Sequence, residues 1–348
     1  MLVIRAARMS DLDALMDMAR QAGSGMTTLK PDPEMLGQRL ATAEASFAQT
    51  IAPDARDYMF VLEHTLDKRI AGVCAIKGAV GLTEPFYNYR IGTLVHCSRE
   101  LDVFTRMETL YLSNDLTGAT ELCSLFLQPD YRSGGYNGKW LSKSRFLFIA
   151  QFQQLFTEKI IAEMRGYLLE DGTSPFYEGL GRHFFKMDFN HVDGLTAMGK
   201  KSFIAELMPR QPLYVDYLPE SAREVIGQVH RSTLPARKLL EQEGMHYEGY
   251  VDIFDAGPVL QGRVKELRSV RDSALRVASE GRGEGRSEDD TECLLVSNTK
   301  LDDFRMVLAQ AAVDGHEIAL SAQELALLHV QAGDPVRTLS LNVRKNNG

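Results

Sequence analysis

The sequence predicts an α+β fold, in which a mixed sheet is flanked by helices and followed by an elaborated second half and a small β-rich, barrel-like C-terminal domain. The first reason is the order of segments: a strand, two helices, several antiparallel strands, and then a strand, a glycine-rich turn and a helix. The second is the run of short β-type segments separated by turns near the C-terminus. With 348 residues and 44% apolar residues, the chain is long enough to bury a core in more than one domain.

The N-terminal third supplies the first strands and helices. "MLVIRAA" predicts a strand, and the next segment predicts a helix that Ser10 caps and Gly23 ends. A second helix is expected over roughly residues 33–50. Apolar runs bounded by turn residues predict further strands at 58–65, 69–80, 89–98 and 119–128.

The rest of the chain continues this mixed pattern. A helix is expected to begin near Lys139, and shorter helices are predicted around 175–180, over 219–230 and over 232–244. Residues 279–290, "SEGRGEGRSEDD", are rich in glycine and charge and predict a flexible segment. We therefore expect a division into residues 1–200, 201–278, 279–290 and 291–348.

Charge and cysteine content exclude several classes of protein. A formal net charge of −8 argues against a broad electrostatic grip on nucleic acid, and no apolar run is long enough to cross a bilayer. The four cysteines, Cys74, Cys97, Cys123 and Cys293, show neither metal-ligand spacing nor a disulfide framework. Cys74 and Cys123 lie in apolar runs and are expected to be buried thiols. These features predict a reduced, cytoplasmic protein without a metal site.

A glycine-rich turn is the feature that points most directly to a ligand. Arg132, Gly134, Gly135 and Gly138 lie between a predicted strand and the helix that begins near Lys139. Glycines let backbone N–H groups approach an anion, and the start of a helix adds unpaired N–H groups and the positive end of its dipole. Together they predict a cradle for a pyrophosphate.

Two well-known nucleotide-binding motifs fit this turn poorly. A Walker A loop needs Ser or Thr after its lysine, whereas Lys139 is followed by Trp140. The segment "GGYNG" does not supply the G-x-G-x-x-G pattern of a dinucleotide site. An ordinary turn without a ligand remains an alternative.

The strand, the Arg-x-x-Gly turn and the helix together resemble the acyl-CoA pyrophosphate loop of the GCN5-related N-acetyltransferase fold. Longer blocks, among them "LYLSNDLTGATELCSLFLQPDYR", "SPFYEGLGRHFFKMDF", "VIGQVH" and "YVDIFDAGP", resemble the bacterial arginine N-succinyltransferase family. The resemblance covers roughly residues 3–258, and "HVQAGDPVR" extends it to the C-terminal domain. It implies transfer of succinyl from succinyl-CoA to the α-amino group of L-arginine, the first step of arginine catabolism by the succinyltransferase route.

The same resemblance implies roles for individual residues. His230, in "IGQVH", matches the family's proton-transferring histidine, although a lone histidine at the end of a predicted helix is more often a surface group. Leu125 matches the position that contacts succinyl-CoA, through its backbone; its side chain is expected to be that of a core leucine. His96 is the second choice among the histidines. Residues 1–200 are then the acyl-CoA-binding core, and 201–278 a second unit that completes the active site.

The residues that select the substrates are less clear from the sequence. Arginine needs a carboxylate for its guanidinium, and the succinyl group brings a carboxylate of its own. Each candidate can equally serve structural hydrogen bonding. The candidates for the acceptor are Arg90, Asn114, Asp115 and Glu163, and those for the succinyl carboxylate are Lys143, Arg145 and Arg165.

Three alternatives to this function stay open. Ornithine or another acyl-CoA could replace one substrate, in a dual-specificity subunit. A non-catalytic acyl-CoA-binding subunit would need no proton carrier, and a nucleotide switch lacks its lysine motif. We expect succinyl-CoA as a co-substrate and no permanently bound cofactor, no nucleic acid or membrane as partner, and a homodimer or a hetero-oligomer with a paralogous subunit.

Overall fold

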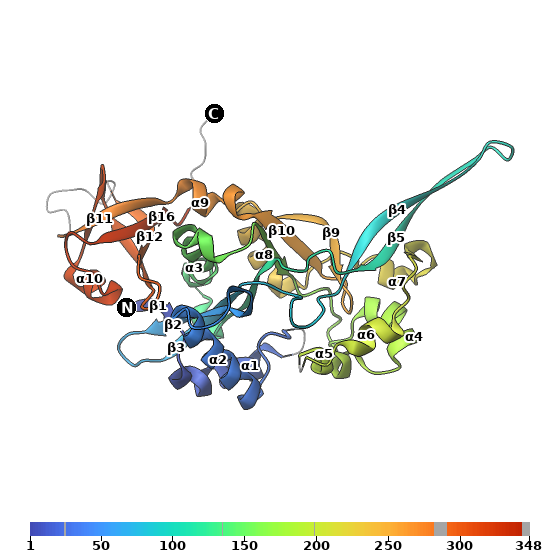
Figure 1. The fold of residues 1–348 in the computed structure, drawn as a ribbon, viewed down its shortest axis with the longest axis horizontal. Helices are drawn as coiled ribbons and strands as arrows, with labels where there is room; N and C mark the ends of the chain where they lie inside the picture. The colour runs from blue at the N-terminus through green and yellow to red at the C-terminus, as the bar shows by residue number, and fades with distance from the viewer. Residues whose placement is uncertain (24–25, 134, 198, 282–290, 343–348) are drawn as a thin grey trace.

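The computed structural model describes residues 1–348 except 24–25, 134, 198, 282–290 and 343–348. Over the described residues, the strands form one continuous mixed sheet with helices packed on both faces, which confirms the predicted α+β class. The molecule is elongated, with a β-rich end, a central layered body and a long hairpin that projects from the opposite end (Figure 1). Among the described residues, none of the helices combines the length and the apolar character that a bilayer-spanning helix needs.

The middle of the sheet is built from strands of both halves of the chain. In spatial order these strands are β1 (Leu2–Ala6), β2 (Asp57–His64), β3 (Ile70–Lys77), β6 (Thr120–Leu127), β7 (Lys159–Glu163), β10 (Pro258–Arg263) and β9 (His246–Asp252). Every neighbouring pair is antiparallel except β6 and β7, which run parallel. The parallel pair interrupts the antiparallel pattern, and strands of the two halves of the chain meet next to it, where β7 pairs with β10.

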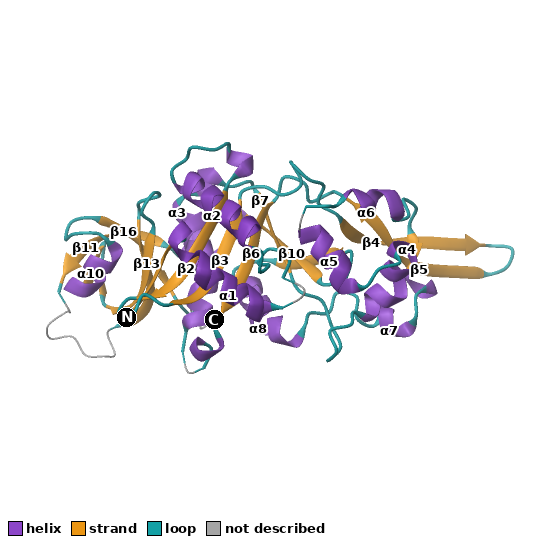
Figure 2. Ribbon diagram, turned by 90° about the horizontal axis from the view of Figure 1, so that it is seen from below, coloured by secondary structure: helices purple, strands orange, loops and turns teal. Residues whose placement is uncertain are grey.

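Helices cover both faces of this central sheet because alternate residues of a strand point to opposite sides. On one face Val61 packs with α1 (Leu12–Ala22) and α2 (Pro33–Phe47). On the other face Phe60 packs with α3 (Asn137–Gln151), the helix that follows the glycine turn. Burial on both faces explains why β2 is a nearly unbroken apolar run. Figure 2 shows these helices over the sheet.

The projecting hairpin consists of β4 (Asn88–Ser98) and β5 (Val103–Ser113), which pair along their whole length. β9 pairs with the first residues of β4, and β8 (Leu213–Tyr214) pairs with β5 near its base. β4 was predicted from the sequence, whereas β5 was missed because the outer part of this ribbon is exposed and its sequence lacks the apolar run of a buried strand.

Short helices form a second body beside the base of the hairpin. They surround an aromatic cluster that includes Phe176, Tyr177, Phe185 and Phe254. A π-helical turn at Tyr177–Gly181 lies where a helix was predicted over residues 175–180. The helices are α4 (Arg182–Phe185), α5 (Phe189–Ala197), α6 (Ser202–Leu207) and α7 (Glu220–Arg223).

The C-terminal strands extend the sheet beyond β1. The elements are β11 (Ala274–Glu280), β12 (Glu292–Asn298), β13 (Arg305–Ala311), β14 (Val313–Asp314), β15 (Glu317–Leu320), α10 (Ala322–Leu328) and β16 (Pro335–Ser340). β13 pairs antiparallel with β1, so the two ends of the chain share one sheet. Residues 279–280, from the segment predicted to be flexible, close β11, whereas residues 282–290 of that segment lie outside the described residues.

Two further helices pack against α3 and complete its burial. These are α8 (Leu234–Gln242) and α9 (Arg268–Asp272), and both contact α3. Every residue of α3 from Trp140 to Ala150 is buried as a result. The helix after the glycine turn is therefore a central element and not a surface helix.

The helix after the glycine turn begins at Asn137, near the expected Lys139. Two other local predictions were wrong. Ser10 lies inside a 3-10 turn before α1 and does not cap that helix. The helix predicted over residues 219–230 is only the short α7, which ends at Arg223. At Gly227 the chain adopts a positive φ of 73° and donates its N–H to the carbonyl of Ala256, so no helix continues beyond this point. His230 therefore lies in a loop.

Candidate active site

A cleft with a volume of about 1590 Å³ opens where β6 and β7 separate. The two strands pair only at their beginnings, Thr120 with Ile160 and Glu121 with Ile161. Beyond these pairs both strands line the cleft, β6 along residues 121–127 and β7 with the residues after it along 162–165. A wedge between parallel strands exposes backbone groups that would otherwise pair across the sheet, so an extended ligand can lie between them.

A bulge in β6 lies inside this wedge. Ala75 pairs with Cys123 and Val73 with Phe126, so β6 has one residue more than β3 in this interval. Ser124 adopts a positive φ of 54°, and its hydroxyl accepts a hydrogen bond from Arg39 at 2.7 Å. A bulge takes its extra residue out of the ladder and turns the neighbouring backbone. It therefore lies directly before Leu125, the residue expected to contact the thioester.

The glycine turn forms one end of the same cleft. Arg132, Gly135, Gly138 and Lys139 all line it, as does Leu125; Gly134 lies outside the described residues. A Cβ on Gly138 would have no neighbour closer than 3.7 Å, so the space above it is open. The structure thus brings together the described residues that were predicted to hold the coenzyme.

Two further features make this turn suited to an anion. Arg132 is held in place because its Nε donates to the carbonyl of Leu127 at 2.7 Å and its guanidinium lies 5.3 Å from the centre of the Phe126 ring. Trp140 makes the first hydrogen bond of α3, to Tyr136. The N–H groups at the start of a helix have no acceptor within it and are available to a phosphate.

His230 lies beside the cleft without lining it. Its backbone N–H donates to the carbonyl of Arg165 at 2.9 Å, and its Nδ1 lies 2.7 Å from the hydroxyl oxygen of Ser232. Arg165 and Ser232 both line the cleft. Burial and the nearby charge of Arg165 lower the pKa of His230, so the imidazole is neutral at neutral pH. The signal for Ser232, a hydroxyl two residues after His230, was present in the sequence but was interpreted as a helix start.

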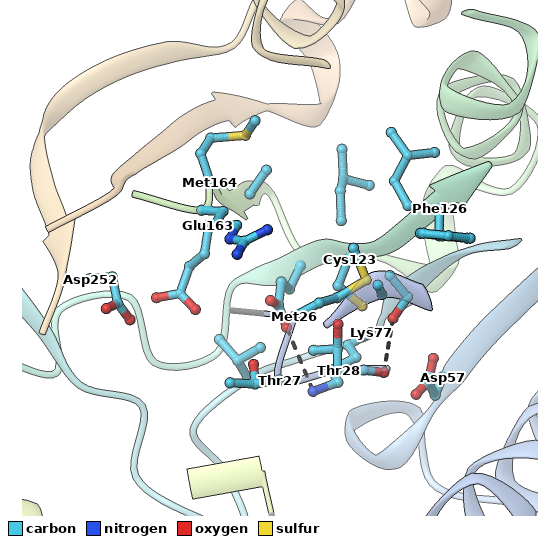
Figure 3. Close-up of a pocket in the computed structure, with 18 of the residues that line it drawn as sticks. Met26, Thr27, Thr28, Asp57, Lys77, Cys123, Phe126, Glu163, Met164 and Asp252 are labelled. Carbon is cyan, nitrogen blue, oxygen red and sulfur yellow. Dashed lines mark hydrogen bonds and ion pairs between the residues drawn. The ribbon is translucent and has the colours of Figure 1, made fainter. Parts of the chain in front are cut away.

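Two carboxylates line the cleft at the ends of β7 and β9. Figure 3 shows the side chains of Glu163 and Asp252 next to each other at the cleft. Burial is the main cause that raises the pKa of both carboxyl groups. The nearby charge of Asp252 raises the pKa of Glu163 further, and the nearby charge of Asp193 raises that of Asp252. Glu163 was among the predicted acceptor residues, whereas Asp252 was missed although it lies in the "YVDIFDAGP" block.

The other substrate candidates have different environments. Arg90 lies 3.8 Å from Asp115, and Asn114 donates to the carbonyl of Phe86; none of the three lines the cleft. Lys143 is fully buried in an ion pair with Glu243 and cannot reach a ligand. Arg145 and Arg165 do line the cleft, and His96 lies on the projecting hairpin against Tyr214.

Comparison with known proteins gives a consistent result over the whole chain. The family described as the arginine N-succinyltransferase beta subunit matches residues 2–269, and the C-terminal domain of that subunit matches residues 275–340. The arginine N-succinyltransferases of Shigella sonnei and Escherichia coli are each 46% identical over 341 residues, which is 98% of this chain and 98% of each relative. The solved structure of arginine/ornithine succinyltransferase subunit AI from Pseudomonas aeruginosa is 33% identical and covers 99% of both chains with a TM-score of 0.89.

Proposed function

The chain belongs to the arginine N-succinyltransferase family, and on that premise we propose that it transfers the succinyl group of succinyl-CoA to the α-amino group of L-arginine. It is an acyltransferase, and its substrates are small molecules. The products of the proposed reaction are N2-succinyl-L-arginine and CoA. The observation that supports this most is that one cleft contains the glycine turn, the bulge before Leu125, and Arg165 and Ser232, the two residues that hydrogen-bond to His230.

Coenzyme A would lie along this cleft. The N–H groups of Gly135 and of the start of α3 would hold the pyrophosphate, with Arg132 and Lys139 supplying positive charge. The pantetheine would follow the free edge of β6 into the wedge. The thioester carbonyl would then meet the N–H of Leu125, which stabilises the oxyanion that forms when the carbonyl is attacked.

His230 would move the proton during the transfer. The step uses the neutral tautomer in which Nδ1–H of His230 donates to the hydroxyl oxygen of Ser232 at 2.7 Å, in place of the one in which Nδ1 accepts the backbone N–H of Ser232 at 3.2 Å. Nε2 then accepts a proton as the substrate's amino group attacks the thioester carbon. A bond forms between the nitrogen and the acyl carbon, the bond between that carbon and sulfur breaks, and the proton on His230 passes to the leaving thiolate. The second proton of the substrate ammonium is released to solvent.

Ornithine is a second candidate acceptor, because the solved relative is an arginine/ornithine succinyltransferase subunit. Ornithine has the same α-amino group as arginine but ends in an ammonium instead of a guanidinium. The two acceptors would therefore react by the same chemistry and differ only in how the far end of the cleft holds them. The homodimer, the hetero-oligomer with a paralogous subunit and the cytoplasmic location stay predictions.

The release of free CoA thiol from succinyl-CoA tests the proposal directly. Purified protein is assayed with and without L-arginine, with L-ornithine as the alternative acceptor and acetyl-CoA as the alternative donor. We expect release that depends on both arginine and succinyl-CoA. Release with ornithine or acetyl-CoA instead would show that the enzyme uses a different acceptor or donor. Tight CoA binding without release for any pair of substrates would support a non-catalytic binding subunit.

A further inference from the structure

Two carboxylates of the cleft wall lack a positive partner. Among the described residues, neither Glu163 nor Asp252 forms an ion pair within 4.0 Å with a lysine or arginine. Some other acids that line the cleft do have one: Asp57 pairs with Arg39, and Glu84 with Lys201. Two carboxylates placed together without a countercharge destabilise each other's ionised form. A cationic ligand would supply the missing charge.

The surroundings of this pair hold it in place. The Glu163 carboxylate accepts a hydrogen bond from the amide of Asn88 at 2.7 Å. Asp252 accepts the backbone N–H groups of Phe254 and Asp255 at 2.7 and 2.9 Å through one oxygen. Each carboxylate is thus fixed on one side by neutral donors.

An unpartnered polar atom lies beside the pair. Asn88 is only 1% exposed, and its carbonyl oxygen has no hydrogen-bond partner, although its amide group contacts Glu163. Buried acceptors without a donor are uncommon and costly. A ligand that brings several N–H donors would satisfy this oxygen together with the two carboxylates. A guanidinium has five such donors in one plane.

The spacing to the reacting group suits an amino acid with a long cationic side chain. Arg165 follows Glu163 by two residues, which is about 6–7 Å along extended backbone. Five single bonds separate the α-carbon of arginine from its guanidinium carbon, which also spans about 6 Å. Since His230 is hydrogen-bonded to the backbone of Arg165, a ligand with its cation at Glu163 would present its α-amino group near His230.

The α-carboxylate of such a ligand would also have a partner in the cleft. Arg165 lines the cleft, and its buried Nε has no hydrogen-bond partner. An α-carboxylate is an acceptor of the kind this group lacks. The cleft therefore offers negative charge at one point and positive charge at another, in the order that a cationic amino acid requires.

We propose that Glu163 and Asp252 bind the guanidinium of the acceptor amino acid, and that Arg165 binds its α-carboxylate. This inference rests on the proposed function and deepens it, because it assigns the acceptor subsite of the same cleft. The pair then selects for a cationic side chain, and Arg165 orients the α-amino group towards the thioester.

The test compares L-arginine with L-citrulline, in which a neutral urea of nearly the same shape replaces the guanidinium. Kinetic constants for both acceptors and for succinyl-CoA are measured for the wild type, E163Q, D252N and the control E84Q. Glu84 also lines the cleft but is already paired with Lys201 at 3.6 Å. Thermal melting of each variant, with and without succinyl-CoA, reports whether it is folded.

We expect the wild type to prefer arginine to citrulline by at least about tenfold, the value of a hydrogen bond to a charged group. E163Q and D252N should lose most of this preference through a higher KM for arginine, with an unchanged KM for succinyl-CoA, and E84Q should behave as the wild type. Equal use of both acceptors by the wild type would overturn the assignment, as would full preference in both variants. If one variant does not fold, the other and the wild-type comparison decide.

Failure of the proposed function would look different. In that case the wild type would release no CoA with succinyl-CoA and arginine, whatever the state of the pair. The shift in melting temperature caused by arginine is then compared with the shift caused by citrulline, in the wild type and in E163Q. This comparison tests the subsite without any reaction. A wild-type shift with arginine that E163Q loses supports the subsite, and equal shifts in both proteins refute it.

Discussion

The backbone N–H of His230 donates a hydrogen bond to the carbonyl of Arg165 at 2.9 Å. Next to it, Val229 and Gly166 form an isolated antiparallel bridge. The loop with the proposed proton carrier is thereby fastened to the chain that leaves β7, one wall of the cleft. The position of the imidazole relative to the wedge is fixed by backbone, so side-chain substitutions can test its chemistry without moving the loop.

Replacing His230 with alanine should lower kcat and leave the affinity for succinyl-CoA unchanged. General acid–base catalysis contributes about 10²–10⁴-fold to rate, and that is the loss we expect. Steady-state kinetics and direct CoA binding measure the two quantities. The control is His183→Ala, which changes an exposed histidine outside the cleft. A His230 variant with wild-type kcat would remove this residue from the mechanism.

The acid limb of the pH–rate profile should reflect the protonation of His230. Its folded pKa is lowered from the usual 6.5, first by burial and then by Arg165, and the reaction needs the neutral imidazole. Activity should therefore be full above this lowered pKa and fall as pH decreases through it. Arg165→Gln removes a positive charge, so the pKa should rise and the limb should move to higher pH. Arg231→Gln, an exposed neighbour, should leave the limb in place; a limb unaffected by either change would contradict the assignment.

Gly138→Ala should raise the KM for succinyl-CoA without destabilising the protein. The added Cβ would lie 3.7 Å from the nearest neighbouring atom, Cδ2 of Leu127, so it fits the folded chain but occupies space open to the pyrophosphate. We expect an increase of several-fold in KM and a nearly unchanged kcat and melting temperature. Gly37→Ala, in the interior of α2 with open space around it, is the control and should stabilise by about 0.5–1 kcal/mol. An unchanged KM in the Gly138 variant would place the pyrophosphate elsewhere.

Lys143→Met should strongly destabilise the fold. Lys143 pairs with Glu243, both side chains are fully buried, and Arg268 is the second cation on the same carboxylate at 3.1 Å. Removing one partner of a buried pair costs about 3–5 kcal/mol because the other charge is left buried. Urea unfolding measures this loss. The comparison is Lys68→Met, because Lys68 is exposed and its pair with Glu63 should be worth less than about 1 kcal/mol. Equal losses in the two variants would show that the buried pair is not important for stability.

Local patterns in the sequence predicted the parts of the site that lie close together along the chain. The strand, the glycine turn and the helix are consecutive, so the sequence alone places Leu125, Arg132, Gly135 and Gly138 in one feature, and all four line the cleft. The start of α3 was expected near Lys139 and lies at Asn137.

The acceptor side could not be predicted in this way. Glu163 and Asp252 come from β7 and the end of β9, and they meet only because β10 places these strands in one sheet. His230 was assigned to a helix end because helix propensity cannot anticipate the positive φ at Gly227. Both features depend on long-range pairing, which leaves no periodic signal in the sequence.

The pairing of β1 with β13 has a consequence for the synthesis of the protein. Ile4 is opposite Met306 in the finished sheet, so β1 is made first and receives its second neighbour only near the end of translation. During that interval the growing chain presents an unpaired strand edge, which invites pairing with other chains. The order of synthesis therefore leaves this edge of β1 without its neighbour until β13 has been made.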